Sequence, residues 1–477
     1  MFGIKKGGLI GGTIWTTLSF VVVSLVYILR ISVLTRYLDK ADFGLVAIVL
    51  FVLGFTNIFA DMGVSSSLLS QQKVSQREYS SLYWGSLCLA VGWYIVVSFT
   101  SPLFAYFYER RELNYLIPIM GIDLIISSIG RQFAVFKQKE FKFKQLAVIK
   151  ISSEVTSMIV AILLASHGFG IWSLIVSLMS TTFVNSILNF IAGFRSHPLI
   201  WYFNYKKTKH LYRIGLYQTG SQVLDFISSQ IDILILGKLL PMSDMGVYSI
   251  VKNLVLRVYS SVNQVVTKVA VPIFAKLKED MTVFKHKYLT MLSGIVIVNI
   301  FFYLIIFIAA KETLILFYGN SYEGYAIILR LLCVWGVFSS VLNCTALIVI
   351  ISTGRTDLGF RWTQFRLLLN PFFVVIGAYF GGIVGTAVSQ AIYSCVTIFF
   401  YRSIVIRHVM PNFSNFDFVR ALYKPLLGSM LIAGVFLSIL DFIPLNNIYL
   451  VLGGVSSVVC LFFLVFFRKD LLNLVKL

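Results

Sequence analysis

Long apolar runs follow one another along almost the whole chain and are separated by short polar segments. An α-helix rises 1.5 Å per residue, so about 20 apolar residues cross the hydrocarbon core of a bilayer. On this basis the pattern predicts fourteen transmembrane helices and an all-α polytopic membrane protein. The predicted spans are 9 to 31, 43 to 66, 81 to 107, 113 to 135, 145 to 166, 169 to 193, 211 to 237, 244 to 268, 288 to 310, 325 to 351, 361 to 380, 381 to 404, 419 to 441 and 446 to 467.

One polar segment between two apolar runs occurs twice. LTRYLDKADFGLVAIV begins at Leu34 and LGKLLPMSDMGVYSIV begins at Leu236, so a constant offset of 202 aligns Gly44 with Gly246. In each copy a cation closes the first run and an Asp-x-Gly opens the next, a pattern typical of a tight turn between two membrane helices. The copies lie six spans apart, which predicts two pseudo-symmetric six-helix lobes of the same topology, related by an axis along the membrane normal.

The repeat also predicts the domain limits. We expect an N-terminal six-helix lobe over 1–194, a cytoplasmic basic linker over 195–213, a C-terminal six-helix lobe over 214–406 and two additional helices over 407–477. The linker reads RSHPLIWYFNYKKTKHLYR, and its aromatic residues predict an interfacial position at headgroup level. A further, approximate similarity between the two lobes pairs GFGIW, from Gly168, with GGIVG, from Gly381.

The charges in the connecting segments give an independent test of this topology, because cytoplasmic loops carry an excess of Lys and Arg. With the N-terminus inside, the cytoplasmic segments hold 27 cations, Arg131 and Lys137 among them, and the outer segments hold six. The six predicted outer cations are Arg36, Lys40, Arg110, Arg111, Lys238 and Lys311. This contrast favours an even number of spans with both termini in the cytoplasm.

Composition excludes several classes of protein. Hydrophobic residues make up 58% of the chain and charged residues 13%, with a mean hydropathy of +0.87, a balance that soluble domains do not show. The net charge of +20 is spread over short loops, so nucleic-acid binding is not expected. The five cysteines lie inside apolar runs and the histidines show no ligand spacing, so we expect no disulfide, metal or other cofactor.

Polar side chains recur at helical spacing inside two adjacent predicted spans. In span 211–237 they are Gln218, Gln222, Asp225, Ser229 and Asp232. In span 244–268 they are Ser249, Asn253, Arg257, Ser260 and Gln264, with Lys252 beside them. Ionisable groups inside spans usually face a hydrated cavity or each other, so two interpretations stay open. Either the stripes line a cavity, or Asp225 pairs with Arg257 and Asp232 with Lys252 in purely structural ion pairs.

Three further charges lie inside or at the edges of spans. Arg30 is near the outer end of the first span, where it either snorkels to the interface or faces a cavity. Lys150 and Glu154 are one helical turn apart, a spacing at which opposite charges usually neutralise each other. Lys150 falls opposite Arg366 of the second lobe at an offset of 216, and both lie near the cytoplasmic ends of their spans.

A set of ordered motifs resembles a known family. TRYLDKADFGLVAI, FADMGVSSSL and YSSLYWGSL lie within residues 31–87 and are followed by FKQKEFKFKQLAVIK, SHGFGIWSLIV, QIDILILGKLLPMSDMGVYSI and VAVPIFAKLKED. Together they resemble the Wzx-type polysaccharide flippases of the multidrug/oligosaccharidyl-lipid/polysaccharide (MOP) exporter superfamily, in the branch similar to the colanic acid exporter. Arg257 departs from the family pattern, in which proline or an apolar residue is common nearby.

The resemblance implies a MATE-like fold of two six-helix bundles around a central cavity, plus two extra helices. It also implies a cargo, undecaprenyl-diphosphate-linked oligosaccharide, that crosses from the cytoplasmic to the outer leaflet by alternating access. A diphosphate needs fixed cations, and sugars need amide and hydroxyl partners. The residues expected to bind this cargo are Arg257, Lys252, Asn253, Gln264, Gln222, Asp225, Asp232, Arg30, Lys150 and Arg366.

We further expect a monomer in the bacterial inner membrane, surrounded by membrane lipid, with proton, sodium or membrane-potential coupling left open. One alternative is a cation-coupled multidrug exporter of the same superfamily, which predicts about twelve spans and an acidic residue in the first. The other is a membrane polysaccharide polymerase or ligase, an enzyme that would need a large outer loop. The first span carries Arg30 and no acid, and the predicted outer loops are short, so a non-enzymatic flippase is favoured.

Overall fold

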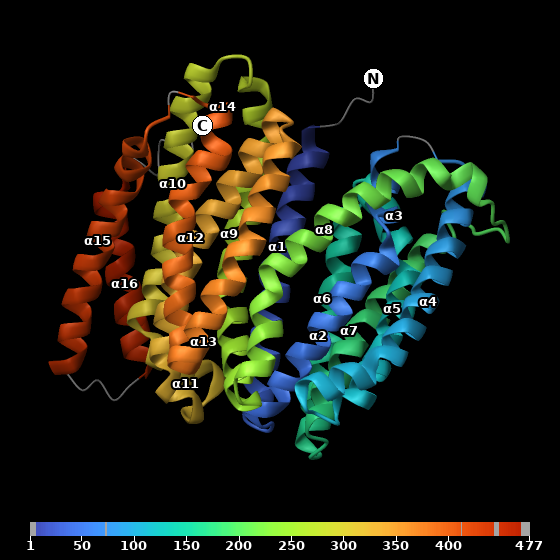
Figure 1. Cartoon of the computed structure of the whole chain (residues 1–477), viewed down its shortest axis with the longest axis horizontal. Helices are drawn as coiled ribbons and strands as arrows, with labels where there is room; N and C mark the ends of the chain where they lie inside the picture. The colour runs from blue at the N-terminus through green and yellow to red at the C-terminus, as the bar shows by residue number, and fades with distance from the viewer. Residues whose placement is uncertain (1–5, 72–73, 412, 443–447, 469–477) are drawn as a thin grey trace. The chain divides into compact units, whose positions relative to one another are not determined.

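The computed structural model describes residues 6–71, 74–411, 413–442 and 448–468, and the regular secondary structure within these ranges is entirely helical (Figure 1). The chain divides into two compact units, Met1–Gly246 and Val247–Leu477. Each unit is built from long apolar helices joined by short turns. The architecture is therefore that of an all-α polytopic membrane protein, as the hydropathy pattern predicts.

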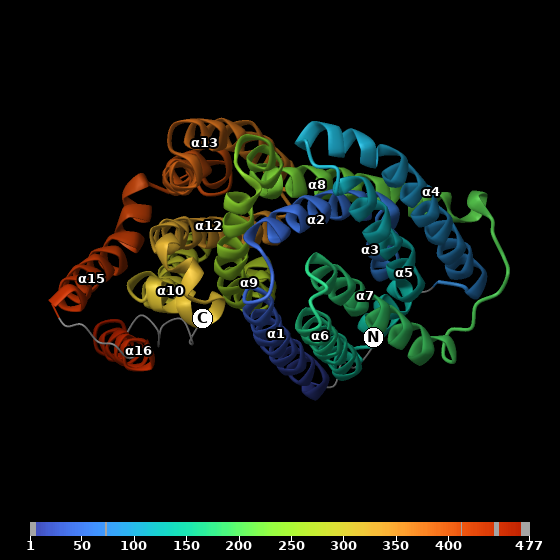
Figure 2. The same ribbon diagram turned by 90° about the horizontal axis from the view of Figure 1, so that it is seen from below.

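The first unit consists of a bundle of long helices and one short one. Its helices are α1 (Lys6–Leu34), α2 (Lys40–Asp61), α3 (Val64–Ser70), α4 (Gln76–Tyr108), α5 (Leu113–Lys139), α6 (Phe143–Ser166), α7 (Ile171–Phe194) and α8 (Tyr205–Leu239). In this unit α6 packs between α1 and α7, while α5 packs on α4 and α7 (Figure 2).

In the second unit α12 packs against both α10 and α13, and α15 and α16 pack against α10 (Figure 1). Its helices are α9 (Met242–Leu277), whose first residues belong to the first unit, α10 (Met281–Ile308), α11 (Ala310–Tyr318), η1 (Asn320–Tyr325), α12 (Ala326–Thr353), α13 (Thr356–Tyr401), η2 (Arg402–Ile406), α14 (Arg407–Val409), α15 (Asn415–Phe442) and α16 (Ile448–Phe466).

Each predicted span falls largely on a helix of the structure. Among the described residues, ten helices are long and apolar enough to cross a membrane by length and composition. Helices α8 and α9 are not among them because polar residues interrupt their apolar sequence, and α13, which counts once, carries two predicted spans on either side of a kink. The count of fourteen therefore stays a prediction.

The span predicted over 43–66 is wrong at its end. Helix α2 stops at Asp61, and the next two residues, Met62 (φ 42°) and Gly63 (φ 64°), adopt the left-handed conformation before α3 begins. Gly63 also permits a close backbone approach, because a Cβ atom there would lie 2.5 Å from the Cα of Gly215 in α8. The Met-Gly pair thus ends the helix that its apolar neighbours would continue.

The two copies of the repeated turn pack against each other within the first unit. A Cβ atom on Gly44 would lie 2.3 Å from the carbonyl oxygen of Met242, and one on Gly246 would lie 1.8 Å from that of Lys40. Both distances are far below contact distance, so the starts of α2 and α9 cross where neither glycine has a side chain. This crossing explains why both copies of the repeat carry glycine at the aligned position.

We expect Gly246→Ala to destabilise the protein, because the new methyl group would overlap a backbone carbonyl that no rotamer change can move. Overpacking of this kind costs about 1–3 kcal/mol or more. The melting temperature in detergent measures the loss. Gly92→Ala in α4 is the control, since a Cβ atom there meets nothing within 4 Å. Equal melting temperatures for the two variants would contradict the close crossing.

One glycine from each of the similar segments GFGIW and GGIVG adopts the same unusual backbone conformation, although the two differ by one position in that alignment. Gly170, the residue before α7, has φ 53° and ψ −134°, and Gly382, inside the kink of α13, has φ 55° and ψ −136°. These angles belong to a region that is accessible essentially to glycine. The kink also divides α13 at Gly381 and Gly382, which confirms the predicted boundary between spans 361–380 and 381–404.

The predicted linker over 195–213 is shorter than expected, because α8 already begins at Tyr205. The preceding segment is fixed to the start of α4. The indole of Trp84 donates a hydrogen bond to the carbonyl of Ile200 (3.0 Å) and stacks on Trp201 with ring centroids 4.2 Å apart. The backbone N–H of Asn204 donates to Ser81 Oγ (2.9 Å).

Helix α8 itself packs on α2, α3 and α4, so it lies in the first compact unit and the unit boundary falls at 246/247. The repeat-based lobe limits differ from this boundary because they follow sequence similarity and not packing. They stay a prediction, as do the limits of the two additional C-terminal helices.

We expect the docking of this segment to depend on pH through His197. Its ring stacks on Phe136 with centroids 4.3 Å apart, and burial lowers the pKa of His197 below its ordinary value of 6.5 despite Glu140, whose carboxylate lies 3.3 Å away. A lowered pKa means that the docked state disfavours the protonated ring, so docking weakens as pH falls below about 6.5. We expect faster amide exchange of residues 195–204 at pH 5.5 than the intrinsic rates predict from pH 7.5. His197→Phe, which keeps the stacked ring, should remove this effect.

Candidate functional site

Among the described residues of the first unit, Arg30 is the most deeply buried cation, with 1% of the residue exposed. Its guanidinium donates hydrogen bonds to Ser157 Oγ in α6 and to Thr181 Oγ1 in α7 (3.3 Å), and it forms an ion pair with Glu154 Oε2 (3.6 Å). Arg30 thus ties α1 to two neighbouring helices. The snorkelling interpretation of Arg30 is wrong, because the side chain lies inside the helix bundle.

The pairing of Glu154 with Arg30 determines which partners are left for Lys150. The i,i+4 pair between Lys150 and Glu154 expected from the sequence does not form, because the carboxylate turns toward α1 instead. Lys150 is exposed on α6, and among the described residues no carboxylate lies within ion-pair distance of its ammonium group. An exposed cation inside an apolar helix is therefore left for another partner.

Two cations that the charge pattern assigns to a cytoplasmic loop lie inside α5. Arg131 forms an ion pair with Asp61 (3.4 Å) and donates hydrogen bonds to Asn57 and to Ser127 Oγ (2.9 Å). Lys137 is buried and donates to the carbonyl (3.2 Å) and to the side-chain oxygen (3.1 Å) of Asn189 in α7. Both side chains thus connect the last turns of α5 to neighbouring helices, and their cytoplasmic side stays a prediction.

The polar stripe of α8 is only partly exposed. Gln222, Asp225 and Ser229 are exposed, whereas Asp232 is buried, with its carboxylate accepting a hydrogen bond from the N–H of Ile233 (3.0 Å). The side chain of Gln218 lies outside the described part of the structure. In a membrane protein, an exposed carboxylate and amide inside a helix favour contact with water over contact with lipid.

The residues predicted in α9 are in different environments. Lys252 is buried, with its ammonium 5.9 Å from the ring centroid of Trp335 in α12, and Arg257 is half-buried. Asn253 is exposed and donates its amide to the carbonyl of Ser249 (2.9 Å). The side chain of Gln264 lies outside the described residues.

Arg366 is more constrained than its repeat partner Lys150. Its guanidinium donates to Asn343 Oδ1 in α12 (2.7 Å) and lies 5.8 Å from the ring centroid of Trp362, one helical turn away. The side chain is half-buried in α13. The aligned positions of the two units thus both carry a cation, one held by an amide and an indole and the other exposed.

One polar cluster of the second unit was missed in the sequence. Ser340 in α12 donates to Asn299 in α10 and also contacts Asn263 in α9, whose amide donates to the Ser340 carbonyl (3.2 Å). All three side chains are buried, so the cluster joins three helices. The sequence does show Asn263 and Asn299 as isolated amides in apolar runs. Their contact with each other's neighbour Ser340 depends on the packing of helices that are distant in the sequence, so it could not be predicted.

The fold is that of a multi-pass membrane protein with charged side chains inside its helices. The structure superimposes on the inward closed conformation of the lipid II flippase MurJ with a TM-score of 0.73 and 16% sequence identity, over 96% of this chain and 99% of that chain. The chain belongs to the family described as polysaccharide biosynthesis protein, whose model matches residues 33–327.

Curated relatives agree with this family over most of the chain. The teichuronic acid biosynthesis protein TuaB of Bacillus subtilis (strain 168) is 26% identical over 463 residues, which cover 96% of this chain and 95% of TuaB. The lipopolysaccharide biosynthesis protein WzxC of Escherichia coli (strain K12) is 22% identical over 420 residues, which cover 87% and 84%. The resemblance to Wzx-type flippases of the MOP superfamily is thereby confirmed.

Proposed function

We propose that this protein moves undecaprenyl-diphosphate-linked oligosaccharide from the cytoplasmic to the outer leaflet of the bacterial inner membrane by alternating access. The cargo would be one repeat unit of a cell-surface polysaccharide. Family membership supports the polysaccharide part of the proposal, and the fold shared with a lipid II flippase supports the movement of a lipid-linked sugar. The protein would move this cargo without making or breaking covalent bonds.

The observation that carries the proposal is the presence of exposed polar side chains inside two helices of the first unit, α6 and α8. Lys150 on α6 offers a cation with no carboxylate partner among the described residues, and Gln222, Asp225 and Ser229 on α8 offer amide, carboxylate and hydroxyl groups. A diphosphate requires the cation to replace its lost hydration, and sugar hydroxyls require the other groups. Of these groups, the exposed lysine separates the two candidate cargoes, because a cationic drug gains nothing from a fixed cation.

In the second unit, Arg366 and Arg257 are half-buried and Lys252 is buried. We assign the two arginines to cargo binding, since Arg366 already presents its guanidinium to an amide oxygen and a half-buried guanidinium can bind phosphate oxygens in a bidentate manner. Asn253, exposed on α9, would contact sugar. Arg30 and Asp232 are buried, so their role in the cycle would be to position helices.

The membrane potential would assist the proposed direction. With the cell interior negative, outward movement of an anion is favoured by about 2.3 kcal/mol per charge per 100 mV. A diphosphate-linked lipid carries its charge outward, whereas a cationic drug moves against the potential. This difference separates the proposed function from the multidrug exporters that share the fold.

Deletion of the gene in its own host tests the proposal. We expect the lipid-linked oligosaccharide to accumulate while the surface polymer is lost, and efflux of the cationic dye ethidium to stay unchanged. Expression of the wild-type chain from a plasmid should restore the polymer. Normal polymer with reduced ethidium efflux would refute the proposal and favour a drug exporter.

A further inference from the structure

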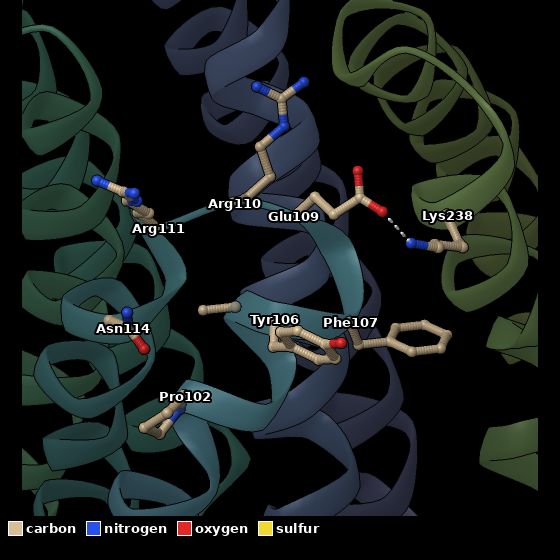
Figure 3. A pocket seen from close by; sticks show the side chains of 9 residues that line it. Pro102, Tyr106, Phe107, Glu109, Arg110, Arg111, Asn114 and Lys238 are labelled. Atoms are coloured by element: carbon tan, nitrogen blue, oxygen red, sulfur yellow. Dashed lines mark hydrogen bonds and ion pairs between the residues drawn. The ribbon is translucent and has the colours of Figure 1, made fainter.

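A cavity of about 680 Å³ opens where α4 ends, α5 begins and α8 ends, all within the first unit (Figure 3). Charged and polar side chains line much of it, namely Tyr106, Glu109, Arg110, Arg111, Asn114 and Lys238. Nothing in the proposed transport path uses these residues. They lie at the opposite ends of α4 and α8 from the segment 195–204 and its docking surface.

The chain forms this cavity with a strained turn. Helix α4 ends at Glu109, a non-glycine residue with φ 57°, and the N–H of Arg110 donates back to the carbonyl of Ala105 (2.9 Å). The left-handed conformation costs about 1–2 kcal/mol for a residue with a side chain. The turn places Arg110 and Arg111 directly before α5.

Glu109 holds one cation of the cavity in place. Its carboxylate forms an ion pair with Lys238 (2.6 Å), which lowers the pKa of Glu109, and the lysine ammonium lies 5.6 Å from the ring centroid of Phe107. Figure 3 shows this pair bridging the end of α4 and the end of α8. The carboxylate therefore neutralises Lys238 and leaves the two arginines in excess.

Arg110 and Arg111 have side chains ready for a ligand. Both side chains are exposed, and within the described residues neither guanidinium has a hydrogen bond or a salt bridge. Arg110 has a weaker electrostatic interaction with the carboxylate of Glu109. The amide of Asn114, one turn into α5, is exposed as well. Three cations and one carboxylate give the cavity a net charge of +2, a setting for an anion.

The position of these charges needs an explanation. Of the six cations predicted on the outer side, three line this cavity, on the face where membrane proteins carry few. Tyr106 is 84% exposed and Phe107 is also exposed beside them, as expected for aromatic residues at headgroup level. Cations at that level meet the phosphates of lipid headgroups, and each guanidinium group can bind phosphate oxygens in a bidentate manner.

We propose that this cavity binds the phosphate of a lipid headgroup in the outer leaflet, with Arg110 and Arg111 as its main ligands and Asn114 as a further donor. The inference rests on the proposed function for the side of the membrane on which the cavity lies. Two lipids have this chemistry, the delivered diphosphate lipid and an anionic phospholipid of the bilayer. In the first case the cavity is an exit site, and in the second it anchors the first unit to the headgroups.

Photolabelling in phosphatidylcholine nanodiscs tests the site locally. The two probes are farnesyl diphosphate and phosphatidylglycerol, each with a diazirine in the chain, and the readout is label on the peptide 102–114. We expect the double variant Arg110→Gln with Arg111→Gln to reduce this label at least fivefold. Arg36→Gln is the matched control, an exposed cation predicted on the same side but outside the cavity, and should leave the label within twofold of wild type.

The outcomes separate the two sources. Arginine-dependent label from farnesyl diphosphate alone identifies the delivered lipid, label from phosphatidylglycerol alone identifies the bilayer, and label from both supports a shared phosphate site. Label that the double variant leaves unchanged, or that Arg36→Gln removes equally, overturns the proposal. Inorganic diphosphate should also compete for label in the wild-type protein, which keeps the test valid if the double variant folds poorly, and label that persists under excess diphosphate contradicts the site.

This readout is independent of transport. A chain that transports the diphosphate lipid normally but shows no arginine-dependent label would contradict the outer site alone. A chain that shows this label but does not transport would contradict the proposed function alone.

Discussion

Arg30→Ala is expected to destabilise the first unit by about 3–5 kcal/mol, the range for breaking a buried ion pair by removing one partner. The loss of the hydrogen bonds to Ser157 and Thr181 contributes less, since such bonds between membrane helices average about 0.6 kcal/mol each. Most of the destabilisation comes from the carboxylate of Glu154, which would stay among helices without its ion-pair partner. The melting temperature and the yield of folded protein in detergent measure the effect.

Two further variants identify the cause. Arg30→Met combined with Glu154→Gln removes both charges and keeps most of the volume, so it should recover most of the lost stability. Arg36→Ala, at an exposed position just after α1, should change stability by less than about 0.5 kcal/mol. If the double variant is as unstable as Arg30→Ala, the buried carboxylate is not the reason for the loss.

Lys150→Gln is expected to lower the rate of transport by about tenfold to a hundredfold while leaving the melting temperature unchanged. A hydrogen bond to a charged group contributes about 1.5–3 kcal/mol, and each 1.4 kcal/mol corresponds to a factor of ten. Stability should not change because Lys150 is exposed and Glu154 already pairs with Arg30. Lys150→Arg should keep most of the rate, since it keeps the charge.

Lys144→Gln provides the matched control for this prediction. It also removes an exposed lysine from α6, but one in the first turn of the helix, where its ammonium lies 5.5 Å from the ring centroid of Trp15. We expect its transport rate to stay within twofold of wild type. Equal losses for Lys150→Gln and Lys144→Gln would show a general effect of surface charge and not a cargo contact.

The helices and their order could be predicted from the sequence because apolar length determines where a membrane helix lies. The repeat also had a physical basis that sequence comparison detects, since Gly44 and Gly246 are both required at one close crossing. The break at Met62 was missed because an apolar window averages over a single left-handed pair. Hydropathy likewise did not show that the long side chain of Lys137 reaches an amide on α7.

The candidate site was less predictable for a different reason. Which residues are ionisable follows from the sequence, but which partner each one chooses depends on the packing of helices far apart in the chain. Glu154 is one turn from Lys150, yet it pairs with Arg30, 124 positions away along the chain. The i,i+4 rule describes isolated helices, in which no third charge competes.

Transport in proteoliposomes tests the central proposal most directly. Fluorescent undecaprenyl-diphosphate oligosaccharide is placed in both leaflets, and the fraction that an added, membrane-impermeant glycosidase reaches is followed over time. The proposed function predicts that the wild-type protein raises this fraction above the outer-leaflet share, that Lys150→Gln slows the rise, and that a lipid with a neutral linker in place of the diphosphate is not moved. A fraction that stays at the outer-leaflet share of protein-free vesicles, with folded wild-type protein present, would contradict it.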